Sequence, residues 1–374
     1  MNISLLVGLK NNLDYSKNFY YSTRNLYPEL ELCFVSYGST DGTHEWLDSL
    51  NDPNLKYFYS DEQKTFSDTF NKAAELSTND YVAYLHNDIV LAPGFVEDLI
   101  KHQGENNIVS YTTIEPPIFS DHERPGKIVW DFGTDIYNFN NDDFLEFVKE
   151  NKEYYKDKTS PGISFFMMMP KKVLLGIGGM DNLFNPMFCE DDDLIFRFKL
   201  LGMNVFTSLD AMCYHFVSKT SRFSDEYQNK TKQIEQSSIR NYIRKWGNRD
   251  GSPKYNIGFV LNNIDMNILF FLEPWCDNIY ITNEDLKNNY INFEQNKTKF
   301  SLNERIKILD KESINNDIVV EFDGTKINND NFLLIQQLSK IIKESGDVGT
   351  FELDIFKIHI NSMNEYQNSL INIY

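Results

Sequence analysis

Three segments of the chain carry side chains that could bind a cation or move a proton. The first is His86-Asn87-Asp88, which directly follows the apolar run 81–85. A carboxylate at the end of a strand can bind Mg²⁺ or Mn²⁺ through oxygen, and such an ion can bridge a diphosphate. An Asn-Asp pair after a strand is also a common turn. This segment alone leaves both interpretations open.

The second segment is strongly acidic and has helical spacing. Glu190 to Asp193 are four consecutive acids, and Arg197 follows them. Adjacent carboxylates raise one another's pKa unless a cation or solvent relieves them. Helical spacing places Glu190, Asp193 and Arg197 on one side, so that Asp191 or Asp192 could face a cleft as a general base. The alternative is an acidic cluster that the dipole at a helix N-terminus favours.

The third segment surrounds His215, which follows the apolar run 203–212. Histidine is a common metal ligand. Lys219 and Arg222 come shortly after it and could bind a phosphate. A single histidine near the end of a strand is also common as a structural residue, so this segment too is ambiguous by itself.

Strand-like and helix-like patterns alternate around these segments. Short apolar runs at 3–7, 30–35, 55–59 and 81–85 predict buried strands. Helical patterns lie between them at 13–26, from Thr40 or Asp41 to Leu50, at 66–76, and from Pro93 to Ile100. This alternation predicts an α/β fold with a mostly parallel sheet and right-handed crossovers. Ligands of such sheets collect at the carboxyl ends of the strands, where His86-Asn87-Asp88 is expected.

The remaining chain predicts a second, smaller domain. Residues 115–160 lack a clear period and predict loops and short elements, and 162–169 predicts another strand. The Gly-, Asn- and Pro-rich stretch 247–253 predicts a linker. We therefore expect domains at 1–250 and 254–374. Apolar runs at 257–261, 278–281, 318–322 and 351–355, with a helical pattern at 332–343, predict a small α/β domain for the latter.

Composition excludes several classes of function. The 374 residues include 36 Lys and Arg against 55 Asp and Glu, a net charge of −19. A surface that coats nucleic acid, or docks on anionic lipid by bulk charge, needs the opposite sign. The four cysteines have no zinc-site spacing and predict buried thiols in a reducing compartment. No signal peptide and no run of about 18 apolar residues is present, so we expect a soluble cytoplasmic protein without a membrane span.

Six segments of the sequence are informative because of the order in which they occur. They are Ile3 to Asn11, Val35-Ser36-Tyr37-Gly38-Ser39-Thr40-Asp41-Gly42-Thr43, Phe70-Asn71-Lys72-Ala73, Leu85-His86-Asn87-Asp88, Gly178-Gly179-Met180-Asp181, and Glu190-Asp191 with Asp193-Leu194, Arg197 and Gly202. In this order they resemble the GT-A fold nucleotide-sugar glycosyltransferases, specifically the large inverting family 2, over about residues 3–221. The fourth segment lies where that family has its Asp-x-Asp metal motif, and the sixth fits its Glu-Asp motif.

The resemblance implies a fold, cofactors and roles. The fold would be a Rossmann-like GT-A catalytic domain followed by the smaller α/β domain. The donor would be a nucleoside-diphosphate sugar, foremost a UDP-sugar, bound with Mn²⁺ or Mg²⁺. Asp88 would bind the metal and His215 would complete its shell. Asp191 would be the catalytic base, Glu190 would orient the acceptor, and Arg197 would hold the acidic helix in place.

Ten further positions would contact the nucleotide or its phosphates. They are Gly8, Leu9, Asn11, Ser36, Tyr37, Asn71, His86, Asn87, Lys219 and Arg222. Ser36 and Tyr37 replace two acids of the family pattern, so the base of the nucleotide stays undecided. His86 replaces the first Asp of the metal motif and could bind either the metal or the ribose.

The leading hypothesis is therefore an inverting glycosyltransferase with a hydroxyl acceptor, in the synthesis of a glycan or surface polysaccharide. The alternative is a catalytically silent GT-A module that binds a nucleotide or glycan as a scaffold, which the changes at Ser36, Tyr37 and His86 favour. The Glu190-Asp191 pair favours catalysis. Self-association through the C-terminal domain, acceptor binding by it, and docking to another enzyme all remain open.

Overall fold

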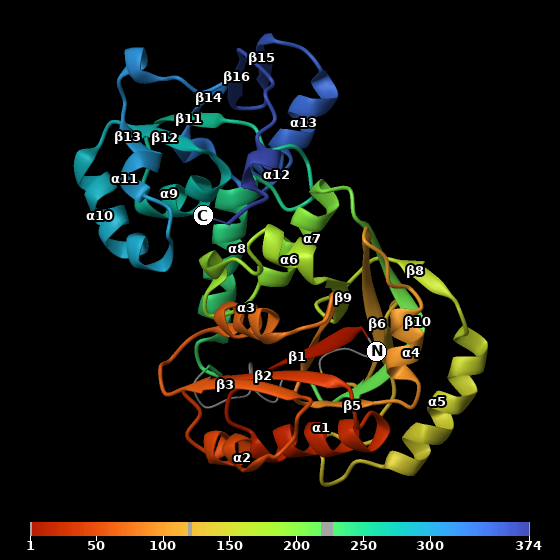
Figure 1. Ribbon diagram of the computed structural model, residues 1–374. Coiled ribbons are helices and arrows are strands. Elements are labelled where there is room, and N and C mark those ends of the chain that lie inside the picture. The colour runs from red at the N-terminus through yellow and green to blue at the C-terminus, as the bar shows by residue number, and fades with distance from the viewer. Residues whose placement is uncertain (1, 119–121, 218–226, 374) are drawn as a thin grey trace. The chain divides into compact units, whose positions relative to one another are not determined.

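The computed structural model describes residues 2–118, 122–217 and 227–373 (Figure 1). Contacts divide the chain into two compact units, Met1–Lys232 with Asn372–Tyr374, and Gln233–Ile371. The domain boundary predicted at 250–254 stays a prediction, because a compact unit does not by itself define a segment that folds alone. Within the described residues, no helix has the length and apolarity needed to cross a bilayer.

The first unit is built on a ten-stranded sheet, and the predicted mostly parallel α/β fold is confirmed. Its main path runs β3-β2-β1-β4-β9-β6-β10-β5, with β7 beside β6 and β8 beside β10. The strands are β1 (Ile3–Leu9), β2 (Glu31–Tyr37), β3 (Leu55–Ser60), β4 (Tyr81–His86), β5 (Ile89–Leu91), β6 (Asn107–Glu115), β7 (Lys127–Val129), β8 (Thr159–Pro161), β9 (Met167–Pro170) and β10 (Asn204–His215). β1, β2, β3 and β4 pair in parallel, as do β6 and β10.

Helices cover both faces of this sheet. They are α1 (Leu13–Leu26), α2 (Thr43–Ser49), α3 (Phe66–Leu76), α4 (Phe95–Ile100), α5 (Asn141–Tyr155), α6 (Lys171–Gly176) and α7 (Glu190–Leu200), with the short helix η1 (Asn182–Phe184). In Figure 1, α3 lies on one face of β1 to β3, and α1 and α2 lie on the other. Phe19 of α1 and Trp46 of α2 join Leu5 and Phe34 of the strands in one buried cluster, which explains why these strands read as continuous apolar runs.

Three expectations in this unit were wrong in detail. The strand predicted at 162–169 begins only at Met167, the first residue of β9. Helix α2 begins after Gly42 rather than at a Thr40 or Asp41 cap, because Gly42 takes the left-handed backbone there (φ 90°) while the Asp41 carboxylate accepts from the Thr43 amide at 3.2 Å. Helix α4 likewise begins after Gly94, not at Pro93.

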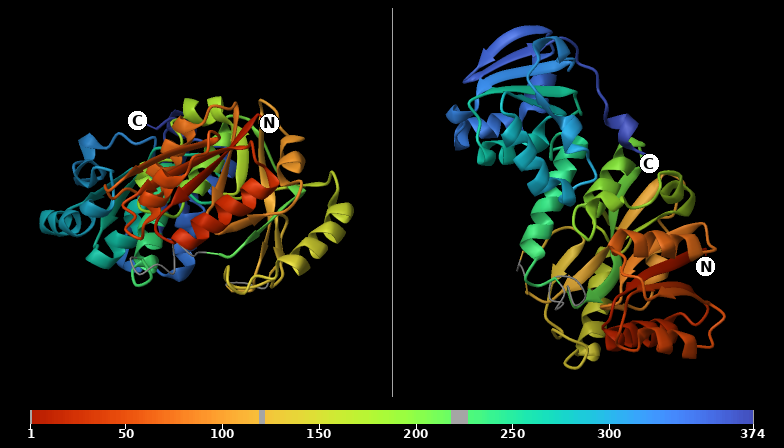
Figure 2. Two further views of the ribbon diagram at one scale, coloured as in Figure 1. Left: turned by 60° about the horizontal axis from the view of Figure 1, so that its bottom comes forward. Right: turned by 90° about the vertical axis from the view of Figure 1, so that its left-hand side faces the viewer.

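The region 115–160 is more regular than its sequence predicted. It contains the 15-residue helix α5. The Asn140 side chain caps the N-terminus of this helix by accepting from the backbone amide of Asp143 at 3.3 Å. The helix has only two buried residues, Phe144 and Val148. Both belong to a buried cluster with Tyr214 of β10, and the Phe144 and Tyr214 ring centroids lie 5.9 Å apart. Figure 2 shows α5 at one side of the unit. Because the apolar stripe is so narrow, the helical period is not apparent in this polar sequence.

The second unit holds a six-stranded sheet of order β13-β12-β11-β14-β16-β15. Its strands are β11 (Ile257–Asn262), β12 (Asn278–Ile281), β13 (Ile306–Ile308), β14 (Ile318–Asp323), β15 (Gly349–Leu353) and β16 (Phe356–Ile360). Its helices are α8 (Thr231–Trp246), α9 (Met266–Leu272), α10 (Glu284–Glu294), α11 (Leu302–Arg305), α12 (Asn329–Gln336) and α13 (Leu338–Ser345), with the short helices η2 (Glu273–Trp275), η3 (Gln295–Lys297), η4 (Lys311–Ser313), η5 (Gly324–Lys326) and η6 (Gln367–Leu370). The predicted small α/β fold is confirmed, although the helix expected at 332–343 is split at Gln337.

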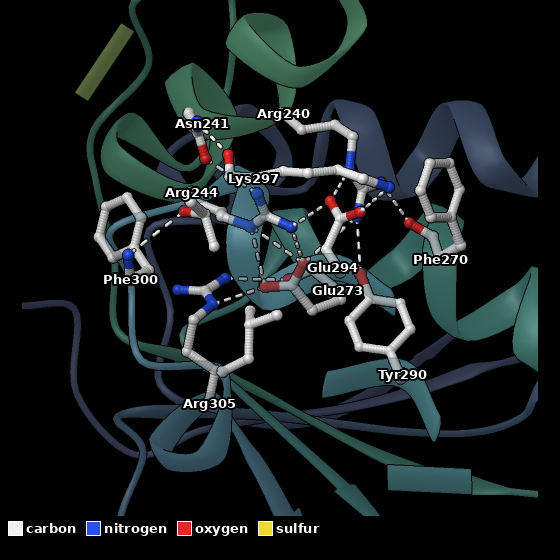
Figure 3. A network of polar contacts seen from close by, with 12 residues as sticks. Arg240, Asn241, Arg244, Phe270, Glu273, Tyr290, Glu294, Lys297, Phe300 and Arg305 are labelled. Carbon is white, nitrogen blue, oxygen red and sulfur yellow. Dashed lines mark hydrogen bonds and ion pairs between the residues drawn. The ribbon is translucent and has the colours of Figure 1, made fainter. Parts of the chain in front are cut away.

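A buried ionic network fastens α8 to the rest of this unit (Figure 3). The Glu273 carboxylate accepts from Arg244 Nη2 and from Arg305 Nε, both at 2.6 Å. Glu294 Oε1 accepts from Arg240 Nε at 2.8 Å and from Arg244 Nη2 at 2.9 Å. Burial alone would raise the pKa of Glu273, but the positive charges of Arg305 and Arg244 lower it to about 2. Glu273 is therefore ionised and paired in the folded protein.

Candidate active site

The two residues predicted to bind a metal, Asp88 and His215, come together with His86 in the first unit. His86 is the last residue of β4, Asp88 precedes β5, and His215 is the last residue of β10. Strand β5 pairs antiparallel with β10 so that Ile89 lies opposite His215, and the Phe216 amide donates to the Asp88 carbonyl at 2.9 Å. This pairing joins segments that lie more than 120 residues apart in the chain. One possible ligand atom from each of the three side chains lies within 4.8 Å of the others.

The chemistry of this group fits a divalent cation. His215 Nε2 lies 3.4 Å and His86 Nδ1 lies 3.8 Å from Asp88 Oδ1. Asp88 is 2% exposed and His215 is 6% exposed, so their charges are largely shielded from water. His86 Nε2 is buried and has no hydrogen-bond partner among the residues that the structure describes. Two imidazoles and a carboxylate are a donor set for transition metals such as Mn²⁺.

The two histidines have opposite electrostatic surroundings. Burial lowers the pKa of His86 to about 4. Burial would lower the pKa of His215 as well, but the charges and hydrogen bonds of Asp88 and Glu115 raise it to about 9. These surroundings favour the neutral form of His86 and the protonated form of His215.

Glu115 is a member of this group that the sequence reasoning missed. It is the last residue of β6, and its Oε1 lies 2.9 Å from His215 Nδ1. Thr113 Oγ1 donates to the same carboxylate at 3.0 Å, and Lys127 Nζ lies 3.7 Å from it. The available signal was the acid that follows the stretch 108–114, rich in Ile, Val and Thr, at the same edge of the sheet as His86 and His215.

The acidic segment forms the first turn of α7, as expected, and Arg197 fixes this helix. Arg197 Nε donates to Asp193 at 2.8 Å, and its two terminal nitrogens donate to the carbonyls of Ile177 and Gly179 at 3.0 and 2.6 Å. Both Arg197 and Asp193 are fully buried. Glu190, Asp193 and Arg197 are buried, whereas Asp191 is half-buried and Asp192 is exposed.

The chain enters α7 through an unusual backbone. Phe188 and Cys189 both have positive φ, 76° and 67°, a left-handed conformation that is uncommon for residues other than glycine. Such conformations persist only where the surrounding structure enforces them, and they cluster at functional sites.

A cavity of about 310 Å³ lies between the acidic helix and Glu115. Its wall is formed by Thr113, Glu115, Arg124, Gly126, Ile163, Ser164, Phe165, Phe166, Asp191, Asp192 and Ile195. Asp191 and Glu115 therefore face the same space, and Glu115 is the direct neighbour of His215. Phe166 also packs on His215, with ring centroids 4.9 Å apart. This volume is at the lower end of the range for small-molecule sites.

The first two carboxyl groups of α7, those of Glu190 and Asp191, have raised pKa values. Burial, with the neighbouring charge of Asp192, raises the pKa of Asp191 to about 6. Burial, with the charge of Asp191, raises the pKa of Glu190 well above its usual range. Glu190 Oε2 has no hydrogen-bond partner within the described parts of the chain. At neutral pH Asp191 is thus ionised, but only about one unit above its pKa, which suits a general base.

The residues predicted to face the nucleotide lie mostly at the carboxyl edge of the sheet, where several already have internal partners. The backbone N–H of Asn11 donates to Ser39 Oγ at 2.9 Å, and the side-chain Oδ1 of Asn11 accepts from the backbone N–H of Thr40 at 2.8 Å. These bonds join the loops after β1 and β2. Leu9 is buried in the core. A Cβ on Gly8 would lie 2.9 Å from Thr69 Cγ2, so its glycine is explained by packing on α3.

The other predicted contacts are also engaged within the protein. Ser36 is fully buried, donates to Ser39 Oγ at 2.8 Å and lies 3.1 Å from His44 Nε2. Tyr37 is buried against Phe58, with ring centroids 5.6 Å apart. Asn71 bonds both the amide and the carbonyl of Met180, at 2.8 and 2.9 Å.

Asn87, Lys219 and Arg222 were also predicted to contact the nucleotide. Asn87 donates to Ser16 Oγ at 3.0 Å. Lys219 and Arg222 lie outside the described residues. The nucleotide-binding roles of all ten predicted residues stay predictions.

These features define a class of protein. A mostly parallel α/β sheet carries possible metal ligands at its carboxyl edge, and an acidic helix shares a cavity with Glu115, the neighbour of one of them. This is the arrangement expected of a GT-A-type domain. Residues 4–175 match the model of the family described as Glycosyl transferase family 2, so the resemblance inferred from the motifs is confirmed for this part of the chain.

Several solved structures are similar to the chain. They include the mannosyltransferase PcManGT from Pyrobaculum calidifontis in complex with GDP-Man and Mn²⁺ (16% identity, TM-score 0.43, 65% of this chain and 63% of that chain), TarS 1–349 from S. aureus in complex with UDP-GlcNAc (15%, 0.41, 65% and 73%), and GalNAc-T7 with UDP, GalNAc and Mn²⁺ (10%, 0.46, 66% and 48%). The similarity thus spans less than two thirds of the mannosyltransferase. No curated protein matches the sequence.

Proposed function

We propose that this protein is a metal-dependent, inverting glycosyltransferase that moves a sugar from a nucleoside diphosphate to a hydroxyl acceptor. The family match supports glycosyl transfer. The observation that carries the proposal is the meeting of two groups at one cavity: Asp191 lines it, and so does Glu115, which contacts His215 beside Asp88. A donor and an acceptor that react with each other must bind next to each other. Asp191 would serve the acceptor, and the residues around His215 and Asp88 would serve the donor.

Asp88, His215 and His86 would hold the cation. A divalent ion at this position would neutralise charge that develops on the leaving diphosphate. The protein's own contribution is to keep the three ligands close together, with Asp88 and His215 buried, through the pairing of β5 with β10.

Asp191 would take the proton of the acceptor. As the acceptor oxygen bonds to the anomeric carbon, the bond from that carbon to the diphosphate breaks, and the hydroxyl proton passes to the Asp191 carboxylate. Attack from the face opposite the leaving group inverts the configuration at the anomeric carbon. Base catalysis of this kind contributes about 10²- to 10⁴-fold.

The metal preference follows from the ligand atoms. Mg²⁺ prefers an all-oxygen octahedral shell, whereas imidazole nitrogens suit transition metals. We therefore expect Mn²⁺ to support nucleotide binding better than Mg²⁺ does. A thermal-shift panel of UDP, GDP and their sugars, with each metal, measures this, because a ligand at about 100 times its Kd adds about 2.7 kcal/mol of stability to the folded state. No shift with any nucleotide would contradict the proposal, and shifts without any sugar transfer would favour the silent scaffold.

The pH dependence of transfer should report Asp191. The pKa of Asp191 is raised to about 6, and only its ionised form can accept a proton. We expect kcat/KM to rise about tenfold per pH unit below pH 6 and to level off above it. Because the charge of Asp192 helps to raise this pKa, Asp192→Asn should move the inflection to lower pH. A profile that is flat from pH 5 to 8 would exclude Asp191 as the base.

The remaining parts of the proposal come from the sequence. They are a UDP-sugar as donor, a glycan or polysaccharide as acceptor, a cytoplasmic location, and self-association through residues 254–374. The nucleotide panel addresses the first of these directly.

A further inference from the structure

Glu115 stands between the histidine cluster and the cavity, and its carboxylate is held in place from several sides. Thr113 Oγ1 donates to it at 3.0 Å, and Lys127 Nζ lies 3.7 Å away. Its backbone pairs with Val129 of β7, and its carbonyl accepts from the Trp130 amide at 3.0 Å. Its side chain is 14% exposed. A side chain fixed in this way can orient a neighbour.

The neighbour that Glu115 contacts is one of the two candidate imidazole ligands. Glu115 Oε1 lies 2.9 Å from His215 Nδ1, while His215 Nε2 is the nitrogen nearest Asp88, at 3.4 Å. When Nδ1 donates its hydrogen to a carboxylate, the lone pair of the neutral ring is left on Nε2. Carboxylates in this position fix the ring and strengthen the histidine as a ligand.

We propose that Glu115 is a positioning residue that sets His215 to bind the cation through Nε2. This inference rests on the proposed metal-dependent function and extends it to a residue outside the recognised motifs. Glu115 makes no contact with the cation in this account; it acts through His215.

The second histidine provides an internal comparison. No carboxylate lies within ion-pair distance of His86 Nε2 in the described parts of the chain, and its ring packs on Phe165 and Phe166 at centroid distances of 4.8 and 5.0 Å. The loss of Glu115 should therefore weaken metal binding only through His215. In a variant that already lacks His215, removing Glu115 should have little further effect.

Mn²⁺ binding measured by electron paramagnetic resonance tests this without using enzyme activity. The free-ion signal gives the Kd of the full chain for Mn²⁺ alone. Glu115→Ala should raise this Kd about 10- to 100-fold. Glu115→Gln keeps an oxygen that can accept from Nδ1, so it should raise the Kd less. His215→Ala and the double variant Glu115→Ala/His215→Ala should have the same Kd within about threefold.

The control and the contradicting results are equally defined. Glu146→Ala removes an exposed carboxylate of α5 and should leave the Kd unchanged. A Glu115→Ala protein with wild-type affinity, or effects of Glu115→Ala and His215→Ala that simply add, would overturn the inference. If Glu115→Ala does not fold, Glu115→Gln and the Co²⁺ absorption spectrum of that variant decide, because a misdirected imidazole changes the spectrum. A wild-type chain that binds no Mn²⁺ would instead overturn the metal site itself.

Discussion

Replacing Asp191 with asparagine should lower kcat for sugar transfer by about 10²- to 10⁴-fold, the usual contribution of a positioned base. Affinity for the nucleotide should change no more than a few-fold, because Asp191 lies on the cavity wall and not among the residues that would hold the cation. Asparagine has nearly the same shape and cannot take the proton. Single-turnover transfer, with nucleotide binding measured in parallel, separates these two effects.

A neighbouring residue provides the matched control for this variant. Asp192→Asn removes an exposed carboxylate from the same cavity and the same helix turn. It should lower kcat far less than Asp191→Asn does. If Asp191→Asn retained full turnover, the assignment of the base would be wrong; if it lost nucleotide binding to the same extent as turnover, Asp191 would be a ligand contact and not a base.

Replacing Glu273 with alanine should destabilise the second unit by about 3–5 kcal/mol, the usual result of removing one partner of a buried ion pair. Arg244 and Arg305 both donate to Glu273 at 2.6 Å, and the carboxylate is fully buried. Without it, the guanidinium of Arg244 keeps only Glu294 as an ionic partner within the described network. Urea unfolding measured by fluorescence and circular dichroism gives the loss.

The pH dependence of this stability has a definite sign. The pKa of Glu273 is lowered from its ordinary value to about 2 in the folded protein, so its stabilising contribution is complete above about pH 5 and is lost as the pH falls toward 2. Glu344→Ala removes an exposed carboxylate of α13 and should change the stability by less than about 0.5 kcal/mol. A Glu273→Ala protein as stable as this control would show that the network does not stabilise the unit.

Much of the fold could be predicted because its signals are local. The helix bounds of α1 and α3 agree with the expected 13–26 and 66–76, and the bounds of β1 to β4 differ from those of the predicted strands by no more than two residues. The helices show apolar residues at helical spacing, and the strands are short apolar runs. Helix α5 was not predicted, because only Phe144 and Val148 mark its buried side.

The candidate site could be predicted only in part, because its contacts are long-range. Asp88 and His215 were found through motif order, but Glu115 lies 100 positions from its partner and has no motif of its own. The ionic network of Glu273 has the same difficulty. Arg240, Arg244 and Arg305 lie 29 to 33 positions from Glu273 in the sequence, and no local pattern marks them as its partners. A charged side chain becomes a buried partner only through tertiary structure.

The central claim is that the cation and the base serve one reaction site. Crystals of the full chain grown with Mn²⁺ and the nucleoside diphosphate selected by the thermal-shift panel test it most directly. The manganese ion, located by its anomalous signal, should lie within bonding distance of Asp88 and His215 and contact the diphosphate. The space next to the diphosphate, where the donor sugar would be, should be open to Asp191. Manganese bound elsewhere, or a diphosphate remote from the cavity that Asp191 lines, would contradict the account.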